Sequence, residues 1–113
     1  MNSPRLSPVP EGTRWPSGDS IDLAMLPLDE EQLTARLGLQ LLHGFEHGLG
    51  RWAGIGGRLP SGADVEFVCY AAMPKSVLMR ADKNGNHSAT VDEALQLLGL
   101  SRAEVSVSPQ ANG

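Results

Sequence analysis

Apolar residues recur at every fourth position between residues 29 and 47, and this period predicts an amphipathic helix. The recurring positions are Leu33, Leu37, Leu41 and Phe45. Asp29 stands three residues before Gln32, an arrangement close to the capping box of a helix N-terminus. Gly48 and Gly50 follow the pattern, as glycines that end helices do. We therefore expect one helix from Asp29 to these glycines, with the apolar stripe facing the core.

Three segments after this helix have the pattern of strands. The segment 63–73 alternates most clearly, and 51–59 and 76–82 flank it. The links between these segments are too short to hold helical crossovers, so we expect an antiparallel meander. One face of the middle strand would carry Val65, Phe67, Cys69 and Ala71, and the other would carry Glu66, Val68 and Tyr70.

A second helix is predicted after the meander. Thr90 and Glu93 have the spacing of a capping box, and Gly99 follows the last apolar position. The expected buried face consists of Val91, Ala94, Leu95 and Leu98. A short fourth strand over 105–108 can follow, and the alternation over 21–26 is compatible with a further short strand.

These elements predict an α+β fold with an N-terminal helix, a three-stranded antiparallel meander, a second helix and a short fourth strand. Residues 1–20 form a leader rich in proline and serine, which we expect to be disordered. One domain is expected over 21–108, and 109–113 would be a frayed tail. The order of elements is weakly similar to that of secretion chaperones, although no residue motif supports membership of that family.

With both helices on one face of the sheet, the opposite face combines polar and apolar side chains. Such a mixture is typical of an interaction surface. Its expected members are Trp52, Glu66, Val68 and Tyr70. We interpret the chain as a small non-enzymatic protein-binding module of the adaptor, immunity or chaperone type, which binds a partner protein or forms a homodimer through this face.

The charge and the cysteine content limit which partners and which cellular compartment are expected. The 113 residues carry a net charge of −4, and no basic cluster is available to neutralise a phosphate backbone. Nucleic acid and anionic membranes are therefore unexpected partners. No apolar run has the length of a membrane span, and no signal peptide is recognisable. The single cysteine, Cys69, cannot form an internal disulfide, which favours the cytoplasm.

One motif suggests a different class of function. His43, Glu46 and His47 have the H-x-x-E-H spacing that zinc peptidases use, and His87 is the one further imidazole. A metal-dependent enzyme or metal sensor built on these four residues is therefore the alternative hypothesis. On a helix whose leucines face the core, however, the pair of histidines would point to solvent, so we expect no metal or other cofactor.

Two other patterns point to weaker hypotheses. Asp82, Asn84, Asn86 and Glu93 match positions 1, 3, 5 and 12 of a calcium-binding loop, but His87 stands where that loop requires glycine. The glycines over 51–62 precede a strand rather than a helix, so they do not form a phosphate-binding loop. No nucleophile and base have a recognisable catalytic arrangement, which favours a protein without enzymatic activity.

Overall fold

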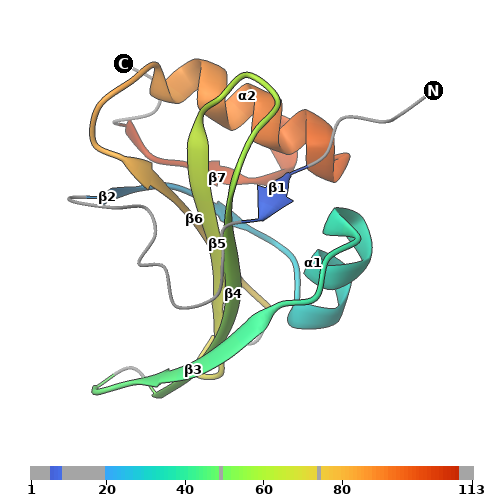
Figure 1. Cartoon of the computed structure of the whole chain (residues 1–113), viewed down its shortest axis with the longest axis vertical. Helices are drawn as coiled ribbons and strands as arrows, with labels where there is room; N and C mark the ends of the chain where they lie inside the picture. Colours follow the sequence, from blue (N-terminus) through green and yellow to red (C-terminus); the bar gives the residue numbers. More distant parts are fainter. Residues whose placement is uncertain (1–5, 9–19, 49, 74, 110–113) are drawn as a thin grey trace.

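The computed structural model describes residues 6–8, 20–48, 50–73 and 75–109. It shows one antiparallel sheet of seven strands, with two α-helices and a short 3₁₀ helix (Figure 1). In chain order the elements are β1 (Ser7–Pro8), β2 (Ser20–Leu26), α1 (Glu30–Leu37), β3 (Leu42–Glu46), β4 (Gly50–Arg58), β5 (Asp64–Tyr70), β6 (Val77–Asp82), α2 (His87–Leu98), η1 (Arg102–Glu104) and β7 (Ser106–Val107).

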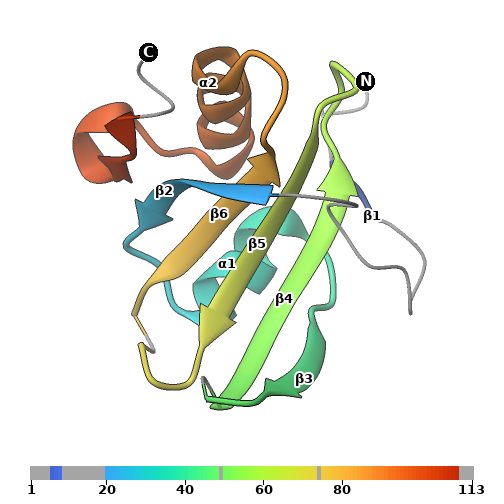
Figure 2. The same ribbon diagram turned by 90° about the vertical axis from the view of Figure 1, so that its left-hand side faces the viewer.

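The strand order is β1-β4-β5-β6-β2-β7, and β3 pairs with the part of β4 that β1 leaves free. The longest ladder joins β4 and β5 and runs from the pair Trp52–Tyr70 to the pair Arg58–Asp64. Figure 2 looks onto the sheet and shows β3 and β4 side by side at one margin. The sheet is therefore built around β4, β5 and β6, and shorter strands form its edges.

The predicted fold class is wrong, because the chain forms a mostly-sheet structure instead of a three-stranded meander between helices. The three predicted strands correspond to β4, β5 and β6. Four additional strands extend this unit on both sides. Two of them, β2 and β7, lie where the sequence allows short strands over 21–26 and 105–108, whereas β3 and the two-residue β1 are not expected.

The first helix is much shorter than the sequence pattern predicts. It has the predicted capping box, in which the Asp29 carboxylate accepts from the Gln32 N–H and the Gln32 side chain accepts from the Asp29 N–H. It ends at Leu37, because Gly38 adopts a left-handed backbone conformation with φ of 67°. The leucine stripe nevertheless continues beyond the helix, since Leu41 is buried from the following loop.

One hydrophobic core lies on the helix-covered face of the sheet. Both helices contribute to it, together with the inward side chains of β2, β4, β5 and β6. Phe67 is fully buried at its centre. Leu6 also belongs to this core, and a side chain at Gly57 would collide with it, so glycine at 57 permits the close approach of β1. The other residues of the predicted leader, 1–5 and 9–19, lie outside the described residues.

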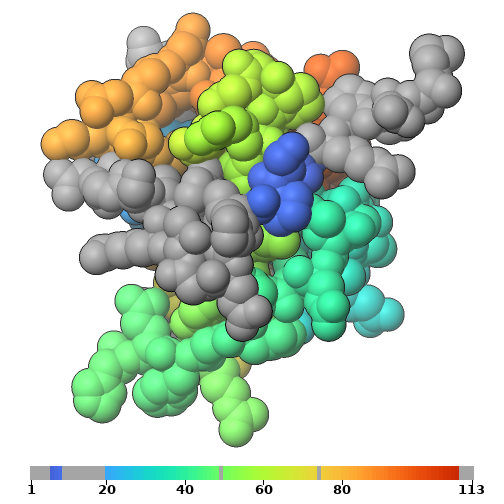
Figure 3. Space-filling view, viewed as in Figure 1, coloured from blue at the N-terminus to red at the C-terminus, as the bar shows by residue number. Residues whose placement is uncertain are grey.

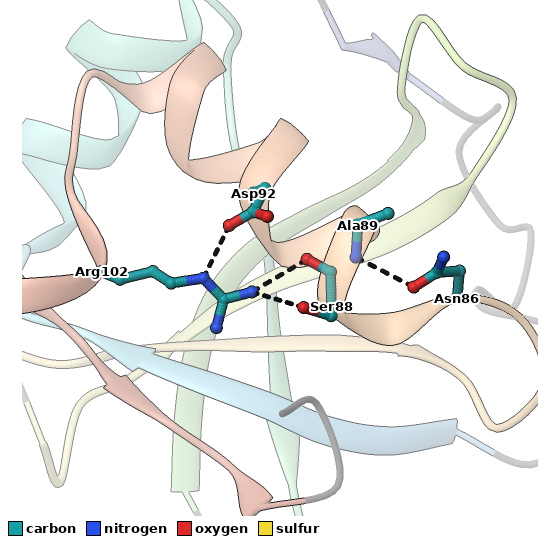
Figure 4. Close-up of polar contacts among 5 residues, drawn as sticks. All are labelled: Asn86, Ser88, Ala89, Asp92 and Arg102. Atoms are coloured by element: carbon teal, nitrogen blue, oxygen red, sulfur yellow. Dashed lines mark hydrogen bonds and ion pairs between the residues drawn. The ribbon is translucent and has the colours of Figure 1, made fainter. Parts of the chain in front are cut away.

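The second helix begins earlier than predicted. Asn86 is its N-cap, and the Asn86 side chain accepts a hydrogen bond from the Ala89 N–H at 3.1 Å (Figure 4). Thr90, the predicted cap, is buried within the helix. Glu93 does not reach back to cap the helix, because its carboxylate accepts from the backbone N–H and hydroxyl of Ser61. Within the described ranges, neither helix combines the length and apolar character needed to cross a bilayer.

Candidate functional site

The two exposed large hydrophobic side chains of the described residues lie at the same end of the sheet. Phe45 on β3 is 70% exposed, and Met73 in the loop after β5 is 44% exposed. Phe45 is opposite Arg51 in the β3–β4 ladder, and the Arg51 carbonyl accepts from the Ala71 N–H at 2.9 Å. We call the end of the sheet formed by residues 43–48, 50–52 and 70–73 the hairpin end.

A cleft of about 440 Å³ opens at the hairpin end, between the sheet and the start of α1. Its acidic wall consists of Asp29, Glu30 and Glu31. His43 lines the cleft from β3, and its Nε2 lies 3.5 Å from the Glu30 carboxylate. Both side chains are more than half exposed, so this contact is screened by solvent and contributes little to stability.

The floor of the cleft is apolar. Ala53 of β4 and Cys69 of β5 face each other in the ladder, and both are buried. Burial raises the pKa of the Cys69 thiol, and the nearby carboxylates of Glu30 and Asp29 raise it further. Cys69 is therefore a protonated, weakly nucleophilic thiol at neutral pH. The cleft combines an apolar floor with a negatively charged wall, and this combination suits an amphipathic, positively charged ligand.

Trp52 connects this cleft to the opposite face of the sheet. The residue lines the cleft and stands opposite Gly44 in the β3–β4 ladder. A Cβ atom at Gly44 would collide with the Trp52 ring. The indole therefore lies directly over the backbone of β3, and any larger residue at position 44 would displace it. Glycine at 44 therefore leaves room for the aromatic ring over the strand.

The face opposite the helices, here called the open face because neither described α-helix packs on it, carries a polar cluster. Arg80 pairs with Asp22 at 3.1 Å and with Glu66 at 3.6 Å. The Tyr70 hydroxyl donates to the Glu46 carboxylate at 3.3 Å. Burial raises the pKa of Glu66, and the positive charge of Arg80 opposes this effect. The charged groups of the open face thus bind one another.

The structure divides the predicted interaction residues into two kinds. Val68 and Tyr70 are each only 5% exposed, although neither belongs to the main core. Trp52 and Glu66 are half-buried. Trp52 and Tyr70 line the cleft at the hairpin end, whereas Glu66 lies toward the other end of β5, opposite Arg80. Within this set, accessible surface therefore remains only at Trp52 and Glu66.

The residues of the alternative metal hypothesis do not converge. His43 and Glu46 lie on β3 three positions apart, so their side chains leave opposite faces of the strand. His47 lies in the following turn. His87 is the first residue of α2, and its Nε2 lies 3.0 Å from the Asp82 carbonyl oxygen. Across the described part of the chain, no group of three His, Cys, Asp or Glu side chains is arranged to hold a metal ion.

Sequence reasoning missed Phe45 and the acidic wall as site residues. Phe45 was assigned to the core because it continued the four-residue leucine period. Glu30 and Glu31 give no separate sign of a binding role in the sequence, because the helix dipole favours acidic residues in a first turn in any case. The sequence did contain a signal that the helix ends early. Gly38 lies eight residues after Glu30, the first residue of the helix, and glycine commonly follows the end of a helix.

Comparison with protein-family models, with curated proteins and with solved structures found no match to this chain. Its function must therefore be inferred from its own geometry.

Proposed function

We propose that the protein is a non-enzymatic binding module that recognises a partner protein through the hairpin end of its sheet. The observation that carries this proposal is the 70% exposure of Phe45 beside a cleft with an apolar floor. Covering a phenylalanine side chain is worth about 1.5–3 kcal/mol. Aromatic side chains of this kind are common anchors of protein interfaces. Met73 extends the apolar surface at the same end.

The charge around Phe45 favours a basic partner. Asp29, Glu30 and Glu31 contribute three carboxylates to one wall of the cleft, and Arg51 is the cation that lines it. The whole chain is also acidic, with a net charge of −4. Complementary charge accelerates association and selects the orientation of the partner. Adaptor, immunity or chaperone roles in the cytoplasm all fit such a module, and nucleic acid and membranes do not.

The proposal is tested by capturing partners on the purified, full-length protein and measuring their affinity again with purified components. We expect wild-type protein to bind a captured partner directly, and Phe45→Glu to weaken this binding by about ten-fold or more, because it removes the anchor and buries a charge. Gln96→Glu is the matched control. It adds the same charge at an exposed position of α2, away from the hairpin end, and should leave the affinity unchanged.

Two results would contradict the proposal. One is a protein that stays monomeric in light scattering and binds no captured protein directly. The other is a partner whose affinity is equally insensitive to Phe45→Glu and Gln96→Glu. A homodimer that is lost in Phe45→Glu would retain the site and identify a second copy as the partner.

A further inference from the structure

Strand β3 is an edge of the sheet, and the direction of its backbone groups follows from the ladder beside it. The Ala71 N–H donates to the Arg51 carbonyl, so residue 51 of β4 directs its backbone groups toward β5. In an antiparallel ladder these directions alternate along the strand. Trp52 therefore directs its backbone groups toward β3, where its partner is Gly44. The neighbouring residues of β3, His43 and Phe45, direct their N–H and C=O groups away from the sheet.

These outward groups are not used elsewhere in the described part of the chain. No hydrogen bond joins the backbone of His43 or Phe45 to another described residue on the outer side of β3. The strand is part of the molecular surface in the space-filling view (Figure 3). Natural sheets usually blunt an exposed edge with prolines, lysines or a bulge. β3 has none of these and carries an exposed aromatic side chain instead.

We propose, on the basis of the binding function above, that an extended segment of the partner adds to β3 as a further antiparallel strand. The partner residues that exchange hydrogen bonds with His43 and Phe45 would direct their side chains to the same face as these two residues. That face includes the Glu30 carboxylate, 3.5 Å from the His43 ring. The segment therefore carries an apolar residue over Phe45 and a lysine or arginine beside Glu30, separated by one residue.

Charge distinguishes this partner from a second copy of the chain. Antiparallel pairing of two β3 strands about Gly44 would place Phe45 opposite His43 in both directions. Such a pair supplies no new cation to Glu30. It also brings together two acidic helix starts, each with Asp29, Glu30 and Glu31, and like charges in proximity oppose association. A basic segment from another protein would pair with the outward backbone groups of β3 and would also bring a positive charge to the acidic wall.

The test uses a fluorescent seven-residue peptide, Thr-Val-Thr-Lys-Thr-Val-Thr, added to the intact ¹⁵N-labelled protein. We expect binding in fluorescence anisotropy and amide shift changes centred on His43 and Phe45. A peptide with glutamate in place of lysine should bind several-fold more weakly. A peptide N-methylated at the first valine and the lysine should bind about ten-fold more weakly, because two backbone donors are removed.

Two variants of the protein test the contribution of the β3 side chain and backbone to peptide binding. Phe45→Val keeps the backbone N–H and should weaken peptide binding only moderately. Phe45→Pro also removes the outward N–H, which is not needed for pairing with β4, and should weaken binding further. If Phe45→Pro fails to fold, the N-methylated peptide still tests the backbone contact on the unchanged protein.

Strand addition is overturned if the peptide does not bind, if N-methylation has no effect, or if the shifts cluster around Glu66 and Arg80 on the open face. These outcomes are separable from failure of the binding function itself. One such outcome is a captured partner that fails to bind Phe45→Glu but binds Phe45→Val and Phe45→Pro with equal affinity. This result would keep the hairpin end as the binding site and exclude pairing with the strand edge. Absence of any partner would remove both proposals.

Discussion

The two ends of the sheet differ in how their polar groups are satisfied. At the end covered by α2, contacts within the protein close the turns. Glu93 binds the Ser61 turn, and Arg102 donates to Asp92 at 2.6 Å and to the carbonyl and hydroxyl of Ser88 at 3.0 and 2.9 Å (Figure 4). At the hairpin end, the cleft, the exposed Phe45 and the outer edge of β3 face solvent. The turns at the α2 end are held by hydrogen bonds within the protein, whereas the hairpin end leaves an aromatic side chain and a strand edge exposed.

The largest effect is expected from a cavity beneath α2. Leu95 is 2% exposed in the core, so Leu95→Ala should lower the free energy of unfolding by about 2–5 kcal/mol. Urea denaturation measures this change, and Gln96→Ala on the same helix is the control, with an expected effect within about 0.5 kcal/mol. Equal stability of the two variants would show that α2 does not pack on the sheet as described.

An intermediate effect on stability is expected from the hydrogen bonds of Arg102 at the same end of the sheet. Arg102→Met removes the hydrogen bonds that link η1 to Ser88 and Asp92 of α2, and should lower the free energy of unfolding by about 1 kcal/mol. Arg58→Met is the comparison, because Arg58 makes a single ion pair with Asp64 and is more exposed. The unfolding midpoint should shift less for Arg58→Met. A shift as large as that of Arg102→Met would mean that the network adds nothing beyond one surface pair.

The smallest effect concerns the electrostatics of the cleft. Burial and the neighbouring carboxylates raise the pKa of Cys69 above its ordinary value of 9.0, so its alkylation by neutral iodoacetamide should become fast only at pH above 9.0. Glu30→Gln removes a negative charge, lowers the pKa of Cys69 and should speed alkylation roughly two-fold at pH 8, since the exposed carboxylate is screened. Gln96→Glu should have no effect. A slower reaction in Glu30→Gln would place the carboxylate away from the thiol.

The central part of the sheet could be predicted from the sequence because the middle strand alternates in polarity and the short links to its neighbours allow only hairpins. The body of α2 was also recognisable, since Val91, Ala94, Leu95 and Leu98 are all buried as expected. The fold class nevertheless could not be derived. The two-residue strand β1 is too short to carry a pattern, and residues 42–46 were assigned to a helix because Leu41 and Phe45 continued its period. Periodicity alone does not distinguish a helical stripe from leucines that reach the core along a loop.

The candidate site depended on where the first helix ends. Ending α1 at Leu37 places residues 42–46 in a strand and turns Phe45 from an expected core residue into an exposed one. Trp52 and Tyr70 were expected on an interaction face, and the structure places both at the cleft. Of the other two residues in the expected set, Glu66 forms an ion pair with Arg80 on the neighbouring strand and Val68 is buried, and no local pattern indicates either outcome.

The lengths of the sheet's margins limit how far an assembly can grow. Among the described strands, β1 and β7 are margins of only two residues, and β3 is a margin of five. If a chain adds to β3, the far edge of the described sheet offers a third chain only the two residues of β7 and the part of β2 that β7 leaves uncovered. The two edges therefore differ in length and shape, and addition at β3 would favour a complex of two chains over a filament.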